Sequence, residues 1–297
     1  MKKLNLSIII TAKDKNDPKL LDLLSSIGEQ TYPKEHYEIL VITEGDSESA
    51  KAIGVRQAKG KIVGIFASDN YLNDKEFISK CMKPFRNNDI VGTFPIRYFY
   101  NKKDNILNRY FSLIGGNDPL AGYLGKNDKE SYLVDLKFQF DYKKGGLKRI
   151  PTLGDNGFFI RRSILLYADL DHYYHIDVCQ DLFNKGYRTY AIINTSIWHR
   201  TGGNILKFFF KRYKYADKFL YNRRWHMVTK QDLPKVRLFI LSTITPLSLF
   251  VPFMGYKKIR DIAWFLHPLV CLLTIITYGL LYLKNWRKYD FSNNTSV

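Results

Sequence analysis

The sequence predicts an α/β fold with a mostly parallel central sheet, followed by an interfacial helix and two hydrophobic membrane helices. Three observations predict it. Short β-branched runs alternate with segments of helical periodicity over residues 4–67. Residues 206–225 interleave aromatic and basic side chains. Two uncharged apolar stretches then follow, at residues 238–256 and 262–283. Alternation of strands and helices is typical of a parallel sheet, because parallel neighbours need a crossover connection.

The first strands and helices follow from local patterns. Residues 4–11 form a nearly continuous apolar run, typical of a strand that is buried on both faces. Apolar residues at helical spacing predict helices over 20–27 and 49–57. Further strands are predicted at 37–43 and 61–67. Ligands of such sheets bind beyond the carboxyl ends of the strands, so the loops that follow these strands are candidate binding loops.

The middle of the chain is less regular. Residues 102–154 are polar and weakly periodic, which predicts a substrate-binding loop or a mobile insertion. An ordered pattern returns at 157–163, and a helix over 177–185 and a strand over 188–197 are expected. The predicted domains are residues 1–203, a basic aromatic interfacial region at 204–235 and a membrane region at 236–297.

Composition limits the partners and the compartment. The formal net charge is +18 and the pI is near 9.6, which favours anionic partners such as nucleic acid, phosphorylated ligands or an acidic bilayer surface. The three cysteines are far apart and form neither a disulfide framework nor a CxxC metal pattern, which is typical of a reducing compartment. The N-terminal apolar run is too short for a signal-peptide core, so the main domain is expected in the cytosol.

Three stretches of residues 6–69 resemble the nucleotide-binding half of the family 2 glycosyltransferases, which have the GT-A fold. The resemblance is carried by SIIITAKD, LVITEGDSES and AIGVRQAKGKIVGIFASDN, in this order and at the family's separations. With a later match it covers about residues 3–203. It implies an inverting transferase that uses a nucleotide-diphosphate sugar as donor and a divalent metal, Mg²⁺ or Mn²⁺.

The resemblance implies that the loops after the first three strands bind the donor. The implied residues are Thr11, Lys13, Asp14, Thr43, Glu44, Ser68 and Asp69. The family holds the cation with a motif of aspartates, which here reads Ala67-Ser68-Asp69, so only its last carboxylate is present. Magnesium often binds through one carboxylate together with substrate phosphates, and a departing nucleoside diphosphate needs its charge neutralised. The alternative for these residues is an ordinary polar turn or a solvated surface.

A second metal ligand is implied at His199. Some family members use a histidine that follows the corresponding strand, and the missing carboxylate at Ala67 makes His199 the expected partner of Asp69. A structural histidine is the alternative.

The acceptor side is implied by two later motifs. The turn that contains Asp155, Asn156 and Gly157 resembles the family's acceptor loop, and its glycines allow close approach to a sugar. The alternative is a strand turn followed by an exposed basic helix.

The segment HIDVCQDLFNKGYR, residues 175–188, corresponds to the place of the catalytic base, although the usual aspartate is displaced. Asp177 is the first candidate, followed by His175 and Asp181, because an attacking hydroxyl must lose its proton. A phosphate acceptor is already ionised and would need no base, so a polyprenyl phosphate acceptor stays open.

The C-terminal third predicts a membrane association. A cation-rich amphipathic helix at 207–224, next to apolar segments, is expected to bind anionic head groups rather than nucleic acid. The second apolar segment has the roughly 20 residues that a span needs. The first carries Pro246 and Pro252, so it either spans, kinks or lies in the interface. A true hairpin would place the cations at 257–260 outside, against the positive-inside tendency.

The sequence therefore predicts an inverting glycosyltransferase at the cytosolic face of the cell membrane. It would move a sugar from a nucleotide-diphosphate sugar to a lipid-linked glycan acceptor. Two alternatives stay open: a polyprenyl-phosphate glycosyltransferase, and a catalytically inactive nucleotide-binding membrane scaffold.

Overall fold

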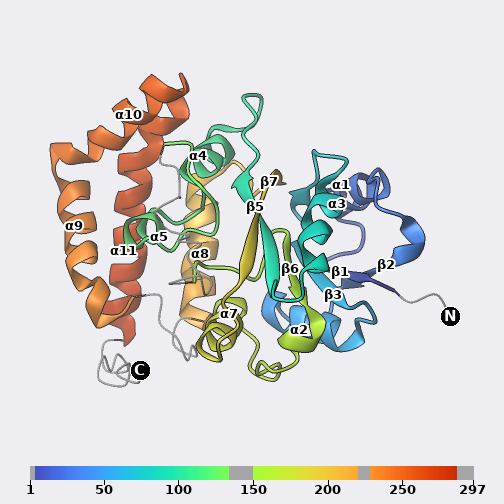
Figure 1. Ribbon diagram of the computed structural model, residues 1–297. Helices are drawn as coiled ribbons and strands as arrows, with labels where there is room; N and C mark the ends of the chain where they lie inside the picture. Colours follow the sequence, from blue (N-terminus) through green and yellow to red (C-terminus); the bar gives the residue numbers. More distant parts are fainter. Residues whose placement is uncertain (1–3, 134–149, 220–227, 286–297) are drawn as a thin grey trace. The chain divides into compact units, whose positions relative to one another are not determined.

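The computed structural model describes residues 4–133, 150–219 and 228–285 and divides the chain into two compact units (Figure 1). The sheet unit comprises Met1–Phe99 and Lys137–Arg200, and the helical unit comprises Tyr100–Leu136 and Thr201–Val297. The predicted domain boundaries stay predictions; in the division into two units, residues 100–133 belong with the C-terminal helices.

In the described residues, seven strands form one sheet in the order β2-β1-β3-β6-β5-β7-β4. The first three lie parallel, as predicted: β2 (Tyr37–Ile42), β1 (Leu6–Thr11) and β3 (Ile62–Ala67). The other strands are β4 (Asn70–Tyr71), β5 (Gly92–Tyr98), β6 (Phe158–Arg161) and β7 (Tyr190–His199). The prediction of a mostly parallel sheet is not confirmed: the sheet is mixed, because β6 runs antiparallel to both β3 and β5, and β4 antiparallel to β7. Only β5 and β7 add a further parallel pair.

The helices between the first strands are where the apolar spacing predicts them. Helix α1 (Pro18–Gly28) follows β1, and α2 (Ser47–Gln57) follows β2. All six residues of β1 are buried, as expected for a strand with neighbours on both edges. Helix α2 begins at a capping box, in which the Asp46 side chain accepts from the backbone N–H groups of Glu48 and Ser49, 2.9 Å each. Gly54 lets α2 approach β1, since a Cβ there would lie 2.5 Å from Ile9 Cγ2.

Shorter helices complete the sheet unit. They are η1 (Lys34–His36), α3 (Phe77–Met82), η2 (Lys83–Arg86) and α6 (Arg162–Leu165). Helix α7 (His175–Asn184) confirms the helix predicted at 177–185 but begins two residues earlier. Strand β7 continues two residues beyond the predicted end at 197, so His199 is its last residue rather than part of a following loop.

The region predicted as irregular, 102–154, contains two helices of the helical unit. They are α4 (Ile106–Ile114) and α5 (Pro119–Leu124), while residues 134–149 lie outside the described part. Each helix is short and capped at both ends: Asn105 and Asp118 cap the N-termini, and the glycines at 115 and 125 end the helices at φ 76° and 71°. Frequent caps and glycines dilute the apolar periodicity, which is why the pattern looked weak.

The predicted interfacial helix is confirmed as a helix in its described part, α8 (Ile205–Phe219); the remaining residues of that prediction, 220–224, lie outside. After η4 (Lys230–Asp232), the first apolar segment is broken into α9 (Leu233–Ile244), η5 (Pro246–Leu249) and α10 (Phe250–Lys258), with a bend of 87°. Pro246 causes the break, because proline holds the preceding Thr245 in an extended conformation, φ −116° and ψ 168°.

The second apolar segment is continuous. It is formed by η6 (Ile262–Leu266) and α11 (His267–Asn285). Among the described residues, Ile262–Asn285 is the one helix that is both long and apolar enough to cross a membrane, with 33% of its most apolar window buried. The structure therefore does not confirm two membrane helices.

Candidate functional site

The carboxyl ends of the three parallel strands meet at one edge of the sheet. Thr11 aligns with Ile42 on β2 and with Ala67 on β3. The Ala12 N–H donates to Ile42 O at 3.0 Å, and the Ser68 N–H donates to Thr11 O at 3.1 Å. The loops predicted to bind the donor therefore start from the same edge of the sheet.

The predicted donor residues differ in exposure. Thr11 is buried at the end of β1, and Thr43 and Ser68 are half-buried. Lys13, Asp14 and Glu44 are exposed on the loops after β1 and β2. Their roles stay predictions.

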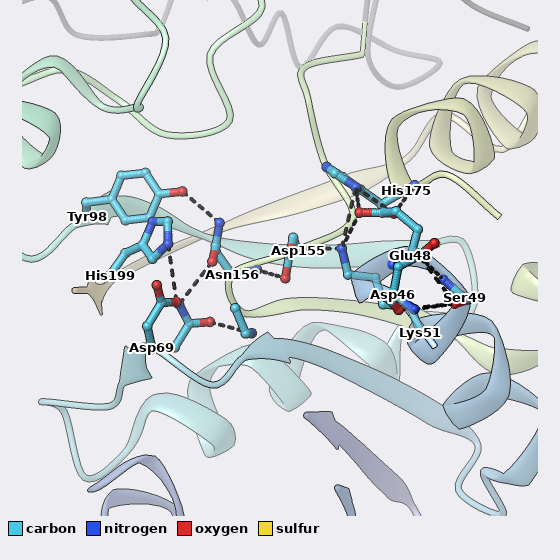
Figure 2. A network of polar contacts seen from close by, with 12 residues as sticks. Asp46, Glu48, Ser49, Lys51, Asp69, Tyr98, Asp155, Asn156, His175 and His199 are labelled. Atoms are coloured by element: carbon cyan, nitrogen blue, oxygen red, sulfur yellow. Dashed lines mark hydrogen bonds and ion pairs between the residues drawn. The ribbon is translucent and has the colours of Figure 1, made fainter. Parts of the chain in front are cut away.

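The sheet topology brings Asp69 and His199 together. Because β4 pairs antiparallel with β7, Asn70 aligns with His199, and the Arg200 N–H donates to Asp69 O at 2.9 Å. The Nε2 atom of His199 lies 3.4 Å from Oδ1 of Asp69 (Figure 2). Burial acts to raise the pKa of Asp69, but His199 and Lys19 outweigh it and the pKa is lowered. Asp69 is therefore a carboxylate at neutral pH.

The pair fits a divalent cation that is shared with a substrate. Two adjacent ligands of one cation, each about 2.1 Å from it, are separated by roughly the distance seen between these two atoms. Asp69 Oδ1 is shielded from solvent and lies in contact with His199 Nε2. Among the described residues, no group of three or more His, Cys, Asp or Glu side chains is arranged to hold a metal. Two protein ligands leave the other positions to phosphate oxygens and water.

Asn156 connects this pair to the turn at residues 154–157, which is predicted to bind the acceptor (the acceptor turn). Its side chain donates to the Tyr98 hydroxyl and accepts from Asn70 Nδ2, 3.0 Å each. Asn156 is the non-glycine residue with positive φ among the described residues, 52°, a conformation that asparagine tolerates better than most residues. The ring of Tyr98 also lies 5.4 Å from that of His199, centroid to centroid. Asn70 and Tyr98 were not among the predicted site residues.

A second polar cluster joins α2, the acceptor turn and the start of α7. Lys51 Nζ lies 3.0 Å from Glu48 Oε1 and 2.9 Å from Asp155 Oδ2. Glu48 accepts from the His175 backbone N–H at 2.9 Å, and both of its oxygens lie 3.0 Å from His175 Nδ1 (Figure 2). The Glu48 and Lys51 side chains are 2% and 1% exposed, so these charges compensate one another away from solvent.

The charges of this cluster are strongly coupled. Burial acts to raise the pKa of Glu48, yet His175 and Lys51 lower it well below its usual range. Burial acts to lower the pKa of Lys51, yet Asp155 and Glu48 raise it. Both groups are therefore ionised at neutral pH. Glu48 and Lys51 were not predicted as site residues, because in the sequence they resemble an ordinary i, i+3 charge pair on a helix surface. The small residues around them in α2 were the one sequence feature that indicated burial.

The three predicted candidates for the base occupy different environments along α7. His175 is its first residue, with 14% of the side chain exposed. Asp177 lies in the first turn and is 2% exposed. Asp181 follows one turn later and is half-buried. The structure brings His175 to the cluster that contains the acceptor turn.

No protein-family model matches the sequence, and no curated protein matches it either. Among solved structures, the chain is similar to mannosyltransferase PcManGT from Pyrobaculum calidifontis in complex with GDP-Man and Mn²⁺, with 13% identity, a TM-score of 0.46, and 96% of this chain and 76% of that chain covered. It is also similar to S. aureus TarS (12% identity, TM-score 0.40), of which it covers 54% with 96% of its own length.

A third similar structure is glucosyl-3-phosphoglycerate synthase from Mycobacterium tuberculosis in complex with Mn²⁺ and UDP-glucose, with 14% identity, a TM-score of 0.44, and 72% of this chain and 77% of that chain covered. The chain thus spans about half the length of the TarS chain. At this level of similarity, residue roles have to come from the site itself.

Proposed function

We propose that this chain is a glycosyltransferase that moves a sugar from a nucleotide-diphosphate sugar and depends on Mg²⁺ or Mn²⁺. The observation that carries the proposal is the pairing of Asp69 with His199, 3.4 Å apart, at the carboxyl end of β3. Carboxylate and imidazole at this separation suit a cation that also binds a diphosphate. When bound, the cation would neutralise the charge that develops on the departing nucleoside diphosphate.

The residues around this pair would have different roles. Asp69 and His199 would hold the cation, and Thr11, Lys13, Asp14, Thr43, Glu44 and Ser68 would contact the nucleotide part of the donor. Asp155, Asn156 and Gly157 would bind the acceptor. Asn156 touches both sides, since its side chain bonds to Asn70 beside the cation pair and its backbone N–H lies 2.9 Å from Asp155 Oδ1.

The proposed outcome is inversion at the anomeric carbon. A single displacement requires the acceptor to attack opposite the leaving diphosphate, with a base that removes the hydroxyl proton. We expect that base in the polar cluster that joins α2, the turn 154–157 and the start of α7. A phosphate acceptor would make the base unnecessary, so polyprenyl-phosphate transfer is the second candidate.

The helical unit supports a lipid-linked acceptor at the cytosolic membrane face. Large apolar side chains are exposed along its C-terminal helices, among them Leu241, Ile244, Leu247, Phe250, Phe253 and Ile262. Exposed lysines of α8, at positions 207, 211, 214 and 218, supply positive charge for anionic head groups. Such an apolar surface next to cations is typical of proteins that insert into one leaflet.

A donor panel tests the proposal. The full chain is incubated with radiolabelled nucleotide sugars, Mn²⁺ and membrane lipid extract, and label in the organic phase is measured. We expect incorporation from at least one donor, its loss with EDTA, and its loss in Asp69→Ala. Asp89→Asn, an exposed aspartate, is the control. Nucleotide binding without turnover for any donor would instead identify an inactive scaffold, and a product with one sugar on a polyprenyl phosphate would identify the second candidate.

A further inference from the structure

We infer that His175, oriented by Glu48, is the general base that removes the proton from the acceptor hydroxyl. This inference rests on the proposed function. It assigns Glu48 as a positioning residue, and it differs from the prediction that places Asp177 first.

The hydrogen bonds of His175 determine which ring nitrogen is free. Both carboxylate oxygens of Glu48 lie 3.0 Å from Nδ1, and the ammonium of Lys51 is more distant at 3.5 Å. An ionised carboxylate can only accept hydrogen bonds, so Nδ1 carries the proton and donates a hydrogen bond to Glu48. In the neutral ring the lone pair is then on Nε2, which is the tautomer that a base needs.

The orientation of the ring is held from several sides. The backbone N–H of His175 also donates to Glu48 at 2.9 Å, so one carboxylate binds both the main chain and the side chain of the same residue. Lys51 holds Glu48 and is itself bound by Asp155, and the ring of Tyr174 lies 5.0 Å from the imidazole. In Figure 2 the Nδ1 edge of the ring faces Glu48, so the Nε2 edge is turned away from it.

Exposure separates His175 from Asp177. A base must touch the acceptor hydroxyl, and 14% of the His175 side chain is exposed at the start of α7. Asp177 is only 2% exposed, so it is covered by the surrounding chain. His175 also lies beside the acceptor turn, since a Cβ at Gly154 would be 2.8 Å from His175 Cβ.

The proposed step conserves atoms and charge. The acceptor oxygen forms a bond to the anomeric carbon of the donor, and the bond from that carbon to the diphosphate oxygen breaks, with its electron pair leaving on the nucleoside diphosphate. The hydroxyl proton moves to Nε2 of His175. The resulting imidazolium is stabilised by the ionised Glu48 and later releases its proton to water.

The first test measures the tautomer and needs neither donor nor acceptor. The full chain with ¹⁵N-labelled histidine is studied by long-range proton–nitrogen correlation NMR, and the His175 signals are assigned by their loss in His175→Gln. We expect an unprotonated Nε2 and a protonated Nδ1 near neutral pH. A protonated Nε2 with a bare Nδ1 would overturn the inference, whether or not the chain transfers sugar.

The second test compares variants in the transfer assay. We expect His175→Gln to lose about 10²–10⁴-fold in kcat while Mn²⁺-dependent nucleoside diphosphate binding is unchanged. His172→Gln, three residues away and 84% exposed, is the control and should retain full activity. Retained transfer in His175→Gln together with loss in a folded Asp177→Asn would overturn the inference in favour of Asp177.

The third test measures the pH dependence of kcat/KM in a Glu48 variant and distinguishes a positioning role of Glu48 from a merely structural one. The groups next to the ring are Glu48, Lys51 and Tyr174. Asp155 binds Lys51, and the buried Tyr173 and Cys179 interact electrostatically with the same charges. Replacing Glu48 by Gln removes the charge that stabilises the imidazolium, so the acid limb of kcat/KM should move to lower pH while the maximal rate falls. An unmoved acid limb would contradict the dyad. Absence of transfer by the wild type with every donor would refute the proposed function instead, and the tautomer measurement would still decide the orientation.

Discussion

Lys51 Nζ lies 2.9 Å from Asp155 Oδ2, and this contact connects the acceptor turn to helix α2. The same ammonium lies 3.0 Å from Glu48, which in turn holds the first residue of α7. One buried cation therefore links the turn 154–157, α2 and, through Glu48, α7.

Removing the Lys51 charge should destabilise the sheet unit strongly. In Lys51→Met the carboxylates of Glu48 and Asp155 lose their shared counter-charge, and breaking one partner of a buried pair costs about 3–5 kcal/mol. Urea unfolding of the full chain measures the change. Lys75→Met is the matched control, because Lys75 is 73% exposed and its loss should change the free energy of unfolding by less than about 0.5 kcal/mol. Equal effects of the two substitutions would contradict the role given to Lys51.

The contribution of Glu48 to stability should depend on pH. Its pKa is lowered in the folded chain, so its contribution is fully present above the unfolded value, about 4.3, and is lost as pH falls toward the folded value. The difference in unfolding free energy between wild type and Glu48→Gln should thus be largest near neutral pH and shrink below about pH 4. Urea titrations at several pH values measure this difference. A difference that does not vary with pH would show that the charge of Glu48 contributes nothing.

Gly154 should be the least replaceable glycine of the site. Its φ is 112°, and an added Cβ would lie 2.8 Å from His175 Cβ and 2.9 Å from His175 O. Gly154→Ala should cost backbone strain of roughly 1–3 kcal/mol plus this clash, and it should push α7 away from Glu48. Gly186→Ala is the control: its φ is 93° but nothing lies within 4 Å, so it bears strain alone. Thermal unfolding and transfer rates of both variants separate the clash from the strain, and a loss in Gly186→Ala as large as that in Gly154→Ala would count against this account.

The metal pair should control nucleotide affinity. Asp69→Asn and His199→Ala each remove one proposed ligand, so Mn²⁺-dependent binding of a nucleoside diphosphate should weaken by at least about tenfold in each variant. Isothermal titration with and without Mn²⁺ measures this, with Asp89→Asn as control. If the nucleotide affinity changed neither with Mn²⁺ nor with these substitutions, the cation site would be removed from the proposal.

The bent segment should enter and leave the membrane on the same face. The pair of helices from Lys230 to Lys258 bends by 87°, which is inconsistent with one straight span. Single cysteines at Lys230 and Lys257, both exposed, should react with an impermeant maleimide from the same side of membrane vesicles. A cysteine at Leu247, near the bend, should react only after detergent is added. The three native cysteines are buried and give little background. Labelling of the two lysine positions from opposite sides would establish a crossing.

Local patterns were sufficient for the first half of the sheet unit. The runs at 4–11, 37–43 and 61–67 correspond to β1, β2 and β3, because a buried parallel strand needs a short apolar run whatever the rest of the chain does. The mixed character of the sheet was not predictable in this way. Nothing local in residues 158–161 specifies that β6 enters antiparallel between β3 and β5, since strand order depends on packing against distant segments.

The residues of the candidate site likewise fall into those that the sequence predicts and those that only the structure shows. Asp69, His199, Asp155 and His175 were predicted as site residues because the short motifs around them resemble those of a glycosyltransferase family. Glu48, Lys51, Asn70 and Tyr98 were not, because their importance comes from contacts with residues far away in the chain. Sequence specifies local conformation and residue chemistry through short-range periodicity and capping. Only tertiary packing decides which charges are buried together, because burial and the compensation of charge depend on every element that covers them.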